Sequence, residues 1–351
     1  MRNSFRFAPL LGVTLLLAAC TQPTTALPVA ETTTDTPASS PTPTAGRVLT
    51  VGVGKTYSTI RAAVAAAQDG DTVRVDPGTY TNDFFEVNRR ITIESASGLA
   101  RLVATVAPTN GKGIITTNTD VTLRGLELTG AKVADRNGAG VRYQGGNLVI
   151  EDSYIHDNEN GLLANSVPLG TIRITRTEFA HNGIGGTGQT HNLYVGDLAQ
   201  LTFDRSYSHD AVVGHEFKSR ARNTTITASR LFDLQGNASY SVDIPNGGNL
   251  TITGSVIEQG ANSQNSAIFT YGTEGLAREG RTVNISGNTI VNRRSSVVGI
   301  LNPSKVPMTI TNNTLYGLTV AQLLNGTTGT TSGNTVTTTA PTLDTSHPYT
   351  R

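Results

Sequence analysis

The chain has 351 residues, with 27 Lys and Arg against 26 Asp and Glu, so its formal net charge at pH 7 is +1. This balance excludes a general electrostatic attraction to nucleic acid or to an anionic membrane surface. Aromatic residues make up only 5% of the chain, Trp is absent and Gly fills 37 positions, which favours a narrow aliphatic interior with many turns. The single cysteine rules out an intramolecular disulfide bond.

The N-terminal segment has the pattern of an export signal. Arg2 and Arg6 precede an apolar run that ends in LAAC, residues 17–20, and the run is too short for a spanning helix in the mature protein. The segment resembles the signal peptide and lipobox of bacterial lipoproteins. This resemblance implies a signal over residues 1–20, cleavage before Cys20 and a lipid on the Cys20 thiol. An ordinary secretory signal with a chance cysteine is the alternative.

Residues 21–46 are rich in Thr, Pro and Ser and carry almost no large apolar side chains. Such a composition cannot bury a core, so we predict a flexible tether. The globular part that follows is therefore expected outside the cytoplasm, in the periplasm or at the cell surface. Its membrane contact would run through the lipid on Cys20.

A short helix and a strand are predicted at the start of the globular part, in residues 51–80. Ser58 or Thr59 can cap the helix, and Gly70 and Asp71 then turn the chain into a strand over 72–75. The apolar face of the helix comprises Ile60, Ala63, Val64 and Ala67. A helix of this kind suits a lid over the open end of a repetitive sheet structure.

One short phrase then returns along the rest of the chain, in the form apolar-x-apolar-x-x-Ser/Asn-x-apolar-x-x-Asn. Its copies include LVIEDSYIHDN (148–158), IRITRTEFAHN (172–182) and LTITGSVIEQG (250–260). Alignment on the second apolar residue places successive copies at positions 123, 150, 174, 203, 226, 252, 285 and 310. Repeats 23 to 33 residues apart indicate one stacked structural unit.

The unit is built from strands, because apolar and polar residues alternate and Thr, Ile and Val dominate. We predict an all-β fold: a single-stranded, right-handed parallel β-helix over residues 47–335 with an N-terminal capping helix. Residues 336–351 lose the repeat and are expected to form a C-terminal tail or cap. The Asn that follows each phrase suits a left-handed bend, and stacked Asn side chains are expected to form a ladder. A monomer is expected, because solenoids cap themselves.

The opening of the globular part, YSTIRAAVAAAQDGDTV (57–73) followed by PGTY (77–80), resembles the start of the pectate-lyase-like β-helix superfamily. The repeats are similar to that superfamily as well. The resemblance implies the fold, whereas functions in the superfamily range from lyases, hydrolases and esterases to proteins without chemistry.

Polar groups are densest on three successive coils, whose strands read NLYVG (192–196), HEFKS (215–219) and YSVDI (240–244). With Val195, Phe217 and Val242 pointing inward, alternation turns the intervening side chains outward. In-register stacking then places Tyr194, Lys218 and Asp243 about 5 Å apart from coil to coil. The same alternation predicts that Glu216 and Ser241 also point outward, with Arg220 and Arg222 on the next turn.

The stretch EFKSRARNTTITASRLFD (216–233) resembles a motif of alginate lyases and chondroitinase-B-type lyases. The match implies Lys218 as the catalytic base and Glu216, with Asn192, as ligands of a calcium ion. The Arg-His-Gly motif of that family is missing, because DIPNGG (243–248) stands where it is expected. Arg220 is the residue that can substitute for the missing arginine.

These residues suit β-elimination of an acidic, uronate-containing polysaccharide. A base removes the proton beside the carboxylate, which requires that a cation neutralise the carboxylate charge. The predicted catalytic residues are Lys218, Arg220, Tyr194 and His215, with Tyr or His as proton donor to the leaving oxygen. The predicted substrate-binding residues are His191, Tyr240, Asp243, Asn246 and Arg222.

Two other functions stay open at this point. A non-catalytic glycan-binding or envelope protein could use the same groove, with Lys218 in an ordinary salt bridge to Glu216 or Asp243. A hydrolase of the polygalacturonase kind needs suitably spaced carboxylates, but the chain has no Asp-Asp pair. The recurring His156, His181 and His209 are interpreted as turn or ladder residues.

Overall fold

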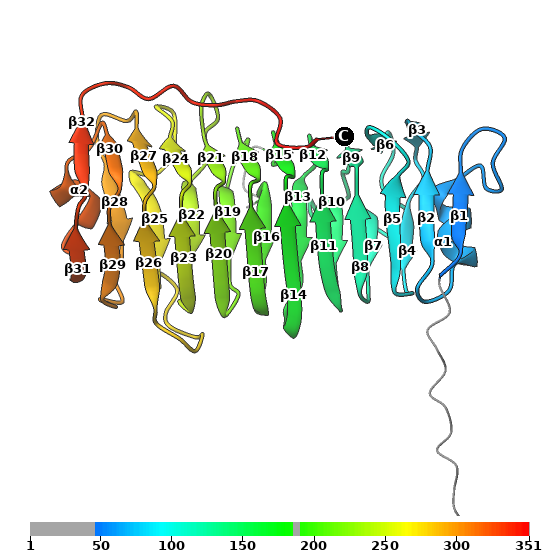
Figure 1. Cartoon of the computed structure of the whole chain (residues 1–351), viewed down its shortest axis with the longest axis horizontal. Coiled ribbons are helices and arrows are strands. Elements are labelled where there is room, and N and C mark those ends of the chain that lie inside the picture. Colours follow the sequence, from blue (N-terminus) through cyan, green and yellow to red (C-terminus); the bar gives the residue numbers. More distant parts are fainter. Residues whose placement is uncertain (1–45, 185–189, 351) are drawn as a thin grey trace, which may run out of the picture. The chain divides into compact units, whose positions relative to one another are not determined.

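The computed structural model describes residues 46–184 and 190–350. This part of the chain is a right-handed parallel β-helix of three long sheets, as predicted (Figure 1). The signal peptide, Cys20 and residues 21–45 of the tether lie outside the described residues, so export, lipidation and location remain predictions. Among the described residues, no helix has the length and apolar character needed to cross a membrane.

Each complete coil contributes one strand to each sheet, the end coils contribute fewer, and the strands pair in parallel with the coils before and after. Sheet A consists of β1 (Val48–Val51), β2 (Thr72–Val75), β5 (Ile91–Ser95), β8 (Val121–Arg124), β11 (Asn147–Glu151), β14 (Val167–Thr175), β17 (Leu198–Asp204), β20 (Asn223–Thr227), β23 (Asn249–Thr253), β26 (Val283–Ser286), β29 (Met308–Thr311) and β31 (Gly329–Ser332).

Sheet B lies next in each coil. It consists of β3 (Gly78–Thr81), β6 (Ala100–Val103), β9 (Leu126–Thr129), β12 (Tyr154–His156), β15 (Glu178–Ala180), β18 (Tyr207–His209), β21 (Arg230–Phe232), β24 (Val256–Gln259), β27 (Thr289–Asn292), β30 (Thr314–Tyr316) and β32 (Thr335–Thr337).

Sheet C completes the coil. It consists of β4 (Phe85–Val87), β7 (Gly113–Thr117), β10 (Ala139–Tyr143), β13 (Asn160–Ala164), β16 (Leu193–Val195), β19 (His215–Ser219), β22 (Tyr240–Ile244), β25 (Ala267–Tyr271) and β28 (Val298–Leu301).

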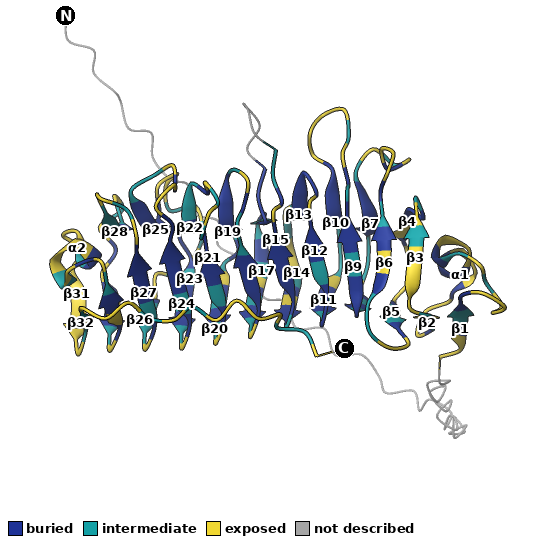
Figure 2. Ribbon diagram, turned by 90° about the horizontal axis from the view of Figure 1, so that it is seen from above, coloured by how far each residue is buried: buried dark blue, intermediate teal, exposed yellow. Residues whose placement is uncertain are grey.

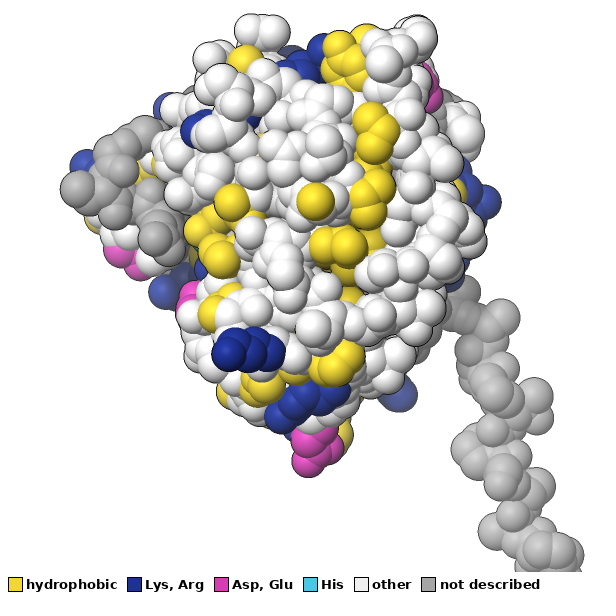
Figure 3. Space-filling view, turned by 90° about the vertical axis from the view of Figure 1, so that its left-hand side faces the viewer, with side chains coloured by type: hydrophobic (Ala, Val, Ile, Leu, Met, Phe, Trp, Pro, Cys, Tyr) yellow, Lys and Arg dark blue, Asp and Glu magenta, His cyan; other side chains and the backbone are white. Residues whose placement is uncertain are grey.

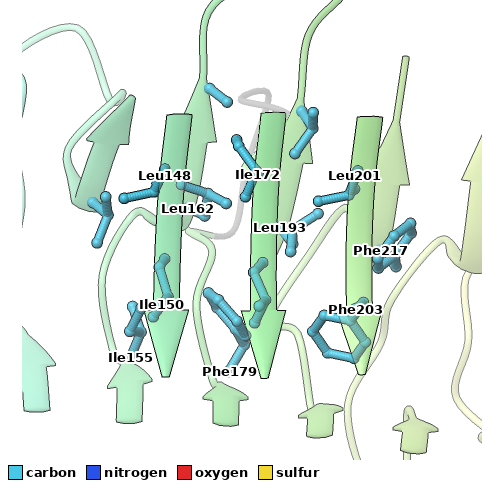
Figure 4. Packing of buried hydrophobic residues seen from close by; sticks show 14 of the residues in the cluster. Leu148, Ile150, Ile155, Leu162, Ile172, Phe179, Leu193, Leu201, Phe203 and Phe217 are labelled. Atoms are coloured by element: carbon cyan, nitrogen blue, oxygen red, sulfur yellow. The ribbon is translucent and has the colours of Figure 1, made fainter. Parts of the chain in front are cut away.

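The core consists of apolar columns that run along the axis of the β-helix. The repeated phrase places Leu148, Ile172 and Leu201 in register on sheet A, and each is buried. Aromatic side chains such as Phe179 and Phe203 fill the interior between the sheets (Figure 4). Figure 2 shows mostly buried strands through the middle coils of the solenoid, whereas β3, β31 and β32 near its ends are largely exposed. Burial of these columns is the main stabilising term of the fold.

Polar ladders fix the turns between the columns. Between sheets A and B, the backbone N–H of Ser206 donates to Ser229 Oγ at 3.1 Å, and that of Ser229 donates to Ser255 Oγ at 3.1 Å. Between sheets B and C, the side chain of Asn158 donates to Asn182 Oδ1 at 3.1 Å. The predicted Asn ladder is therefore confirmed. The left-handed residue, however, is the one before the Asn, as at Asp157 with φ 54° and at His181 with φ 51°.

Both ends of the solenoid are covered. Helix α1 (Ile60–Ala66) contacts β1, β2 and β4, and the Thr59 hydroxyl accepts from the Ala62 N–H at its N-terminus. At the other end, the short helix α2 (Val320–Leu324) packs on β28. The C-terminal end face shows mostly uncharged polar surface, with a few separate apolar side chains (Figure 3). A polar terminal coil protects the exposed edges from further pairing.

The C-terminal residues form a strap rather than a loose tail. After β32 the chain runs back along the outer side of sheet B toward β12 (Figure 1). Arg230 on β21 donates to the Ser346 carbonyl at 2.7 Å, and its Nη1 lies 2.7 Å from the Asp344 carboxylate. His347 Nδ1 lies 2.6 Å from Glu178 Oε2 on β15. The strap therefore ties the last coil to the middle of the solenoid.

Candidate functional site

The outward column of sheet C carries the site. The register pairs Tyr194 with Lys218 and Lys218 with Asp243, as predicted. The inward neighbours Val195, Phe217 and Val242 are completely buried, also as predicted. Strand alternation therefore brings three polar side chains from β16, β19 and β22 onto one wall, with coils about 4.8 Å apart.

Lys218 and Asp243 form the centre of this wall. Lys218 Nζ lies 2.7 Å from Asp243 Oδ2, and the two side chains are 6% and 3% exposed. The Thr270 hydroxyl donates to the other Asp243 oxygen, and His215 Nε2 lies 3.5 Å from Oδ2. Asp243 thus contacts Lys218 and Thr270 through its two oxygens, and it fixes the Lys218 side chain in place.

Arg220 lies beside Lys218 and binds a carboxylate from a distant loop. Its Nη1 and Nη2 donate to the two Glu274 oxygens at 2.6 and 3.0 Å, and its Nε donates to the Tyr194 hydroxyl at 3.0 Å. Asn246 Oδ1 accepts from Arg220 as well. Glu274 also lies 3.5 Å from Lys218 Nζ. Two cations on the wall therefore share one carboxylate.

Two neutral histidines pack behind these cations. Burial lowers the pKa of His191 well below its usual value, and repulsion from the nearby His215, when protonated, and Lys218 lowers it further. Burial, followed by the charges of Lys218 and Arg220, lowers the pKa of His215 to about 3. His191 Nδ1 accepts from the His215 backbone N–H at 3.1 Å, so its ring proton lies on Nε2. The two Nδ1 atoms are 2.9 Å apart, which assigns the bridging proton to His215.

These side chains line a groove of about 460 Å³ that continues toward the N-terminal coils. His191, Tyr194, Lys218 and Arg220 line one end of it, as the sequence led us to expect. The other end is lined by residues that the sequence analysis missed, namely Asn137, Arg142, Leu163, Asn165 and Ser166. A long groove of this kind suits a linear polymer.

Glu216 and Asn192 do not face the groove. Glu216 is fully buried, and its Oε2 accepts from Asn192 Nδ2 at 2.6 Å and from the Ser208 hydroxyl at 3.0 Å. The expectation that Glu216 points outward with Lys218 is wrong, and so is the same expectation for Ser241, whose hydroxyl donates to the Glu258 carbonyl.

The reason is that alternation begins only after the turn. A Cβ on Gly161, which lies one register step before Asn192, would meet the Phe179 ring and the Asn182 side chain in the interior. The second strand position, occupied by Gly161 in β13, Glu216 in β19 and Ser241 in β22, therefore faces inward together with the third position.

This placement does not fit a calcium ion that contacts a substrate in the groove. Burial, followed by the charge of Asp233, raises the pKa of Glu216 to about 8, which favours a neutral carboxyl. Asn192 Oδ1 accepts from the backbone and side chain of Asn182. No mechanistic step is therefore assigned to calcium, and a calcium requirement stays a prediction.

The remaining predicted residues lie at the margin of the wall. The Tyr240 ring stacks on His215 with centroids 5.2 Å apart. Arg222 Nε lies 3.8 Å from Asp197, which also pairs with Arg278 at 3.2 Å. Arg278 Nε donates to the Arg220 carbonyl at 2.7 Å, so Arg278 supports the wall although the sequence analysis missed it.

A second titratable cluster lies on the outer face of sheet B. His209 Nδ1 lies 2.8 Å from Asp210 and its Nε2 lies 3.1 Å from Glu178. His156 repeats this arrangement with Asp157 at 2.5 Å and Glu127 at 3.1 Å. Ligand atoms of His181, His209 and Asp210 lie within 4.8 Å of one another. Since both ring nitrogens of His209 are already bonded to carboxylates, the arrangement is that of a structural ion-pair ladder.

Comparison with known proteins supports the fold. Pectate lyase Pel9A aligns with a TM-score of 0.55 at 16% identity, over 84% of this chain and 78% of the lyase. A pectin methylesterase from Aspergillus niger aligns with a TM-score of 0.40 at 12% identity, over 86% of this chain and 93% of the esterase. The PL6 family alginate lyase AlyGC aligns with a TM-score of 0.40 at 16% identity, over 83% of this chain and 39% of the lyase.

The sequence matches no known protein family. It also matches no curated protein. The protein shares the parallel β-helix fold of pectate lyase Pel9A, and this fold alone does not define its function.

Proposed function

We propose that this protein binds an acidic, uronate-containing polysaccharide along sheet C and cleaves it by β-elimination. The observation that carries the proposal is the position of Glu274. Its carboxylate is bound by both terminal nitrogens of Arg220 and lies 3.5 Å from Lys218 Nζ. Glu274 is 48% exposed and comes from the loop after β25, so a substrate carboxylate can take its place. The pectate lyase fold of Pel9A supports this reading.

The wall supplies the parts that β-elimination needs. The reaction removes the proton on the carbon beside the carboxylate, breaks the neighbouring carbon–oxygen bond and leaves a carbon–carbon double bond. Arg220 would neutralise the carboxylate in two-point fashion, which stabilises the negative charge that develops there. Lys218 would remove the proton after losing its own, and a base in reach contributes roughly 10²- to 10⁴-fold.

The leaving oxygen needs a proton donor. The Tyr194 hydroxyl, held by Arg220 Nε at 3.0 Å, lies on the groove. The Nε2–H of His191 is the second donor on this wall, because its Nδ1 is occupied by the His215 N–H. Asp243 Oδ2, 2.7 Å from Lys218 Nζ, holds Lys218 on the same wall as this donor.

The test is an absorbance assay for the unsaturated sugar that β-elimination produces. The full chain is incubated with polygalacturonate, alginate and chondroitin sulfate, each with calcium and with a chelator. We expect absorbance growth on at least one polymer, and its loss in Lys218→Ala. Lys132→Ala, at an exposed loop position, is the matched control. Absence of the product on every acidic polymer would contradict a lyase.

A non-catalytic glycan-binding protein is the second candidate. It is favoured by the ion pair between Lys218 and Asp243, in which both side chains are almost fully buried. Such a pair holds the proton that a base must lose. Polymer binding without any unsaturated product, and equal binding at all pH values at which the protein stays folded, would support this candidate over the lyase.

A further inference from the structure

We infer that Arg142 forms a second carboxylate-binding subsite, which holds a uronate unit of the same polymer at the far end of the groove. This inference rests on the proposed function and specifies a second point at which the polymer is bound. The strand register places Arg142 and Lys218 in the same outward column of sheet C. Arg142 pairs with Leu163, Leu163 with Tyr194, and Tyr194 with Lys218. Three steps of about 4.8 Å place Arg142 about 14 Å from Lys218 along the wall.

Arg142 differs from the other cations of the groove in having no carboxylate. Lys218 is paired with Asp243 and Arg220 with Glu274. Among the described residues, the only side-chain hydrogen bond of Arg142 runs from Nη2 to Asn165 Oδ1, at 2.7 Å. Its Nε is buried and has no hydrogen-bond partner in this part of the chain. Burial lowers the pKa of Arg142, and the charge of Asp135 only partly opposes this.

An uncompensated cation in a partly desolvated position is unfavourable for the free protein. A carboxylate that enters the groove would bond to the two terminal nitrogens of Arg142, since Nε is inaccessible and Asn165 accepts only one of the Nη2 protons. The planar guanidinium suits this two-point contact better than an ammonium does. The local arrangement is therefore built for an anion.

The surroundings of Arg142 suit a sugar acid more than a small inorganic anion. Asn137, Asn165 and Ser166 line the same end of the groove, and amides and hydroxyls can bond sugar hydroxyls in either direction. Leu163 and Tyr194 form the floor between Arg142 and Lys218. This apolar and aromatic stretch can contact the ring faces of intervening sugar units.

The subsite predicts a dependence on chain length. An oligomer too short to reach from Lys218 to Arg142 gains nothing from Arg142, whereas a longer one does. If the protein cleaves its polymer, loss of Arg142 is expected to raise KM and leave kcat unchanged, because the contact is remote from the bond that breaks.

The test compares Arg142→Gln with Arg173→Gln by calorimetric titration of the full chain with polygalacturonate and with its methyl-esterified, neutral form. Arg173 lies on the outer face of sheet A and is 54% exposed, so its loss changes net charge equally without touching the groove. We expect Arg142→Gln to weaken polygalacturonate binding about tenfold and Arg173→Gln to change it less than twofold. Arg142→Lys keeps the charge but cannot make the two-point contact of a guanidinium. Its affinity for polygalacturonate is expected to lie between those of the two Gln variants.

Equal affinities of Arg142→Gln and Arg173→Gln for polygalacturonate, with wild-type binding intact, would overturn the subsite and leave the proposed function standing. Failure of the wild-type chain to bind any acidic polymer would overturn both. The thermal unfolding midpoint serves as the second readout. Saturating polymer should raise it less in Arg142→Gln than in wild type, and equal increases would also count against the subsite.

Discussion

Sheets B and C each carry a cluster of charged and aromatic residues on the middle coils, yet the two clusters differ in what their charges do. On sheet B, His156 and His209 each bond two carboxylates, and the C-terminal strap covers the cluster. On sheet C, the cations lie in an open groove, and one of them has no carboxylate partner among the described residues. The density of titratable residues alone therefore does not distinguish the two clusters. They differ in access to a groove and in the presence of a cation without a carboxylate partner.

The largest expected effect on sheet C comes from a substitution of Arg220. Arg220→Lys keeps a positive charge but loses the two-point contact that the guanidinium makes with a carboxylate. We expect kcat/KM for the acidic polymer to fall about 10²-fold or more, with an unchanged unfolding midpoint. Lyase activity is measured by the unsaturated product. Equal activity of Arg220→Lys and wild type would show that carboxylate neutralisation does not depend on this side chain.

The structural role of the sheet B cluster has a pH signature. Burial lowers the pKa of His209, but the bonds to Asp210 and Glu178 outweigh burial and raise it to about 9. The folded-state pKa lies above the unfolded value near 6.5, so protonated His209 stabilises the folded protein. This contribution to the free energy of unfolding is complete below about pH 6.5 and is lost as the pH rises toward 9. The expected loss in the free energy of unfolding is about 3 kcal/mol.

The measurement is denaturant unfolding of wild type and His209→Gln between pH 6 and pH 9. The difference between the two proteins isolates His209 from other groups that titrate in this range. We expect the variant to be less stable at pH 6 and the gap to narrow with increasing pH. A difference in the free energy of unfolding that stays constant or widens with pH would show that His209 is not held as an imidazolium.

Glu274 offers a way to sharpen the account of the groove. Its pKa is lowered, chiefly by the hydrogen bond with Arg220, so under the proposed function it would compete as an anion with a substrate carboxylate for Arg220. Glu274→Gln should strengthen binding of the acidic polymer by about tenfold, as measured by titration at fixed ionic strength. Weaker binding in this variant would mean that Glu274 positions Arg220 instead of competing with the ligand.

The smallest expected effect concerns the strap. Deletion of residues 340–351 removes the contacts of Asp344 and His347 with sheet B. Such partly exposed pairs and ring contacts contribute about 1–2 kcal/mol together. The unfolding midpoint should fall by a few degrees while polymer binding stays unchanged. Loss of polymer binding in the deletion variant would instead indicate that the polymer binds on sheet B, beside the strap, and not on sheet C.

The sequence was informative where the coil-to-coil period decides the structure. The repeated phrase predicts the apolar columns of sheet A, and its Asn predicts the ladder at Asn158 and Asn182. The register of Tyr194, Lys218 and Asp243 follows from the same period. These features depend only on alternation within a strand and stacking between coils.

Other features escaped prediction for identifiable physical reasons. Glu216 turned inward because alternation does not hold at the second position of β19, where Glu216 and the next residue, Phe217, are both buried. Arg142 was overlooked because a single charge in GVRYQ gives no local sign of the groove that it lines. Glu274 reaches Arg220 from 54 residues away, through a loop whose path no repeat specifies.

The most direct measurement of the central claim is hydrogen exchange of the full chain with and without a bound polyuronate, read by mass spectrometry. A polyuronate bound on sheet C should slow exchange in residues 214–222 and in residues 137–145, at the two ends of the groove, and leave exchange over residues 207–210 on sheet B unchanged. Protection confined to the sheet B strands and the strap would contradict binding on sheet C.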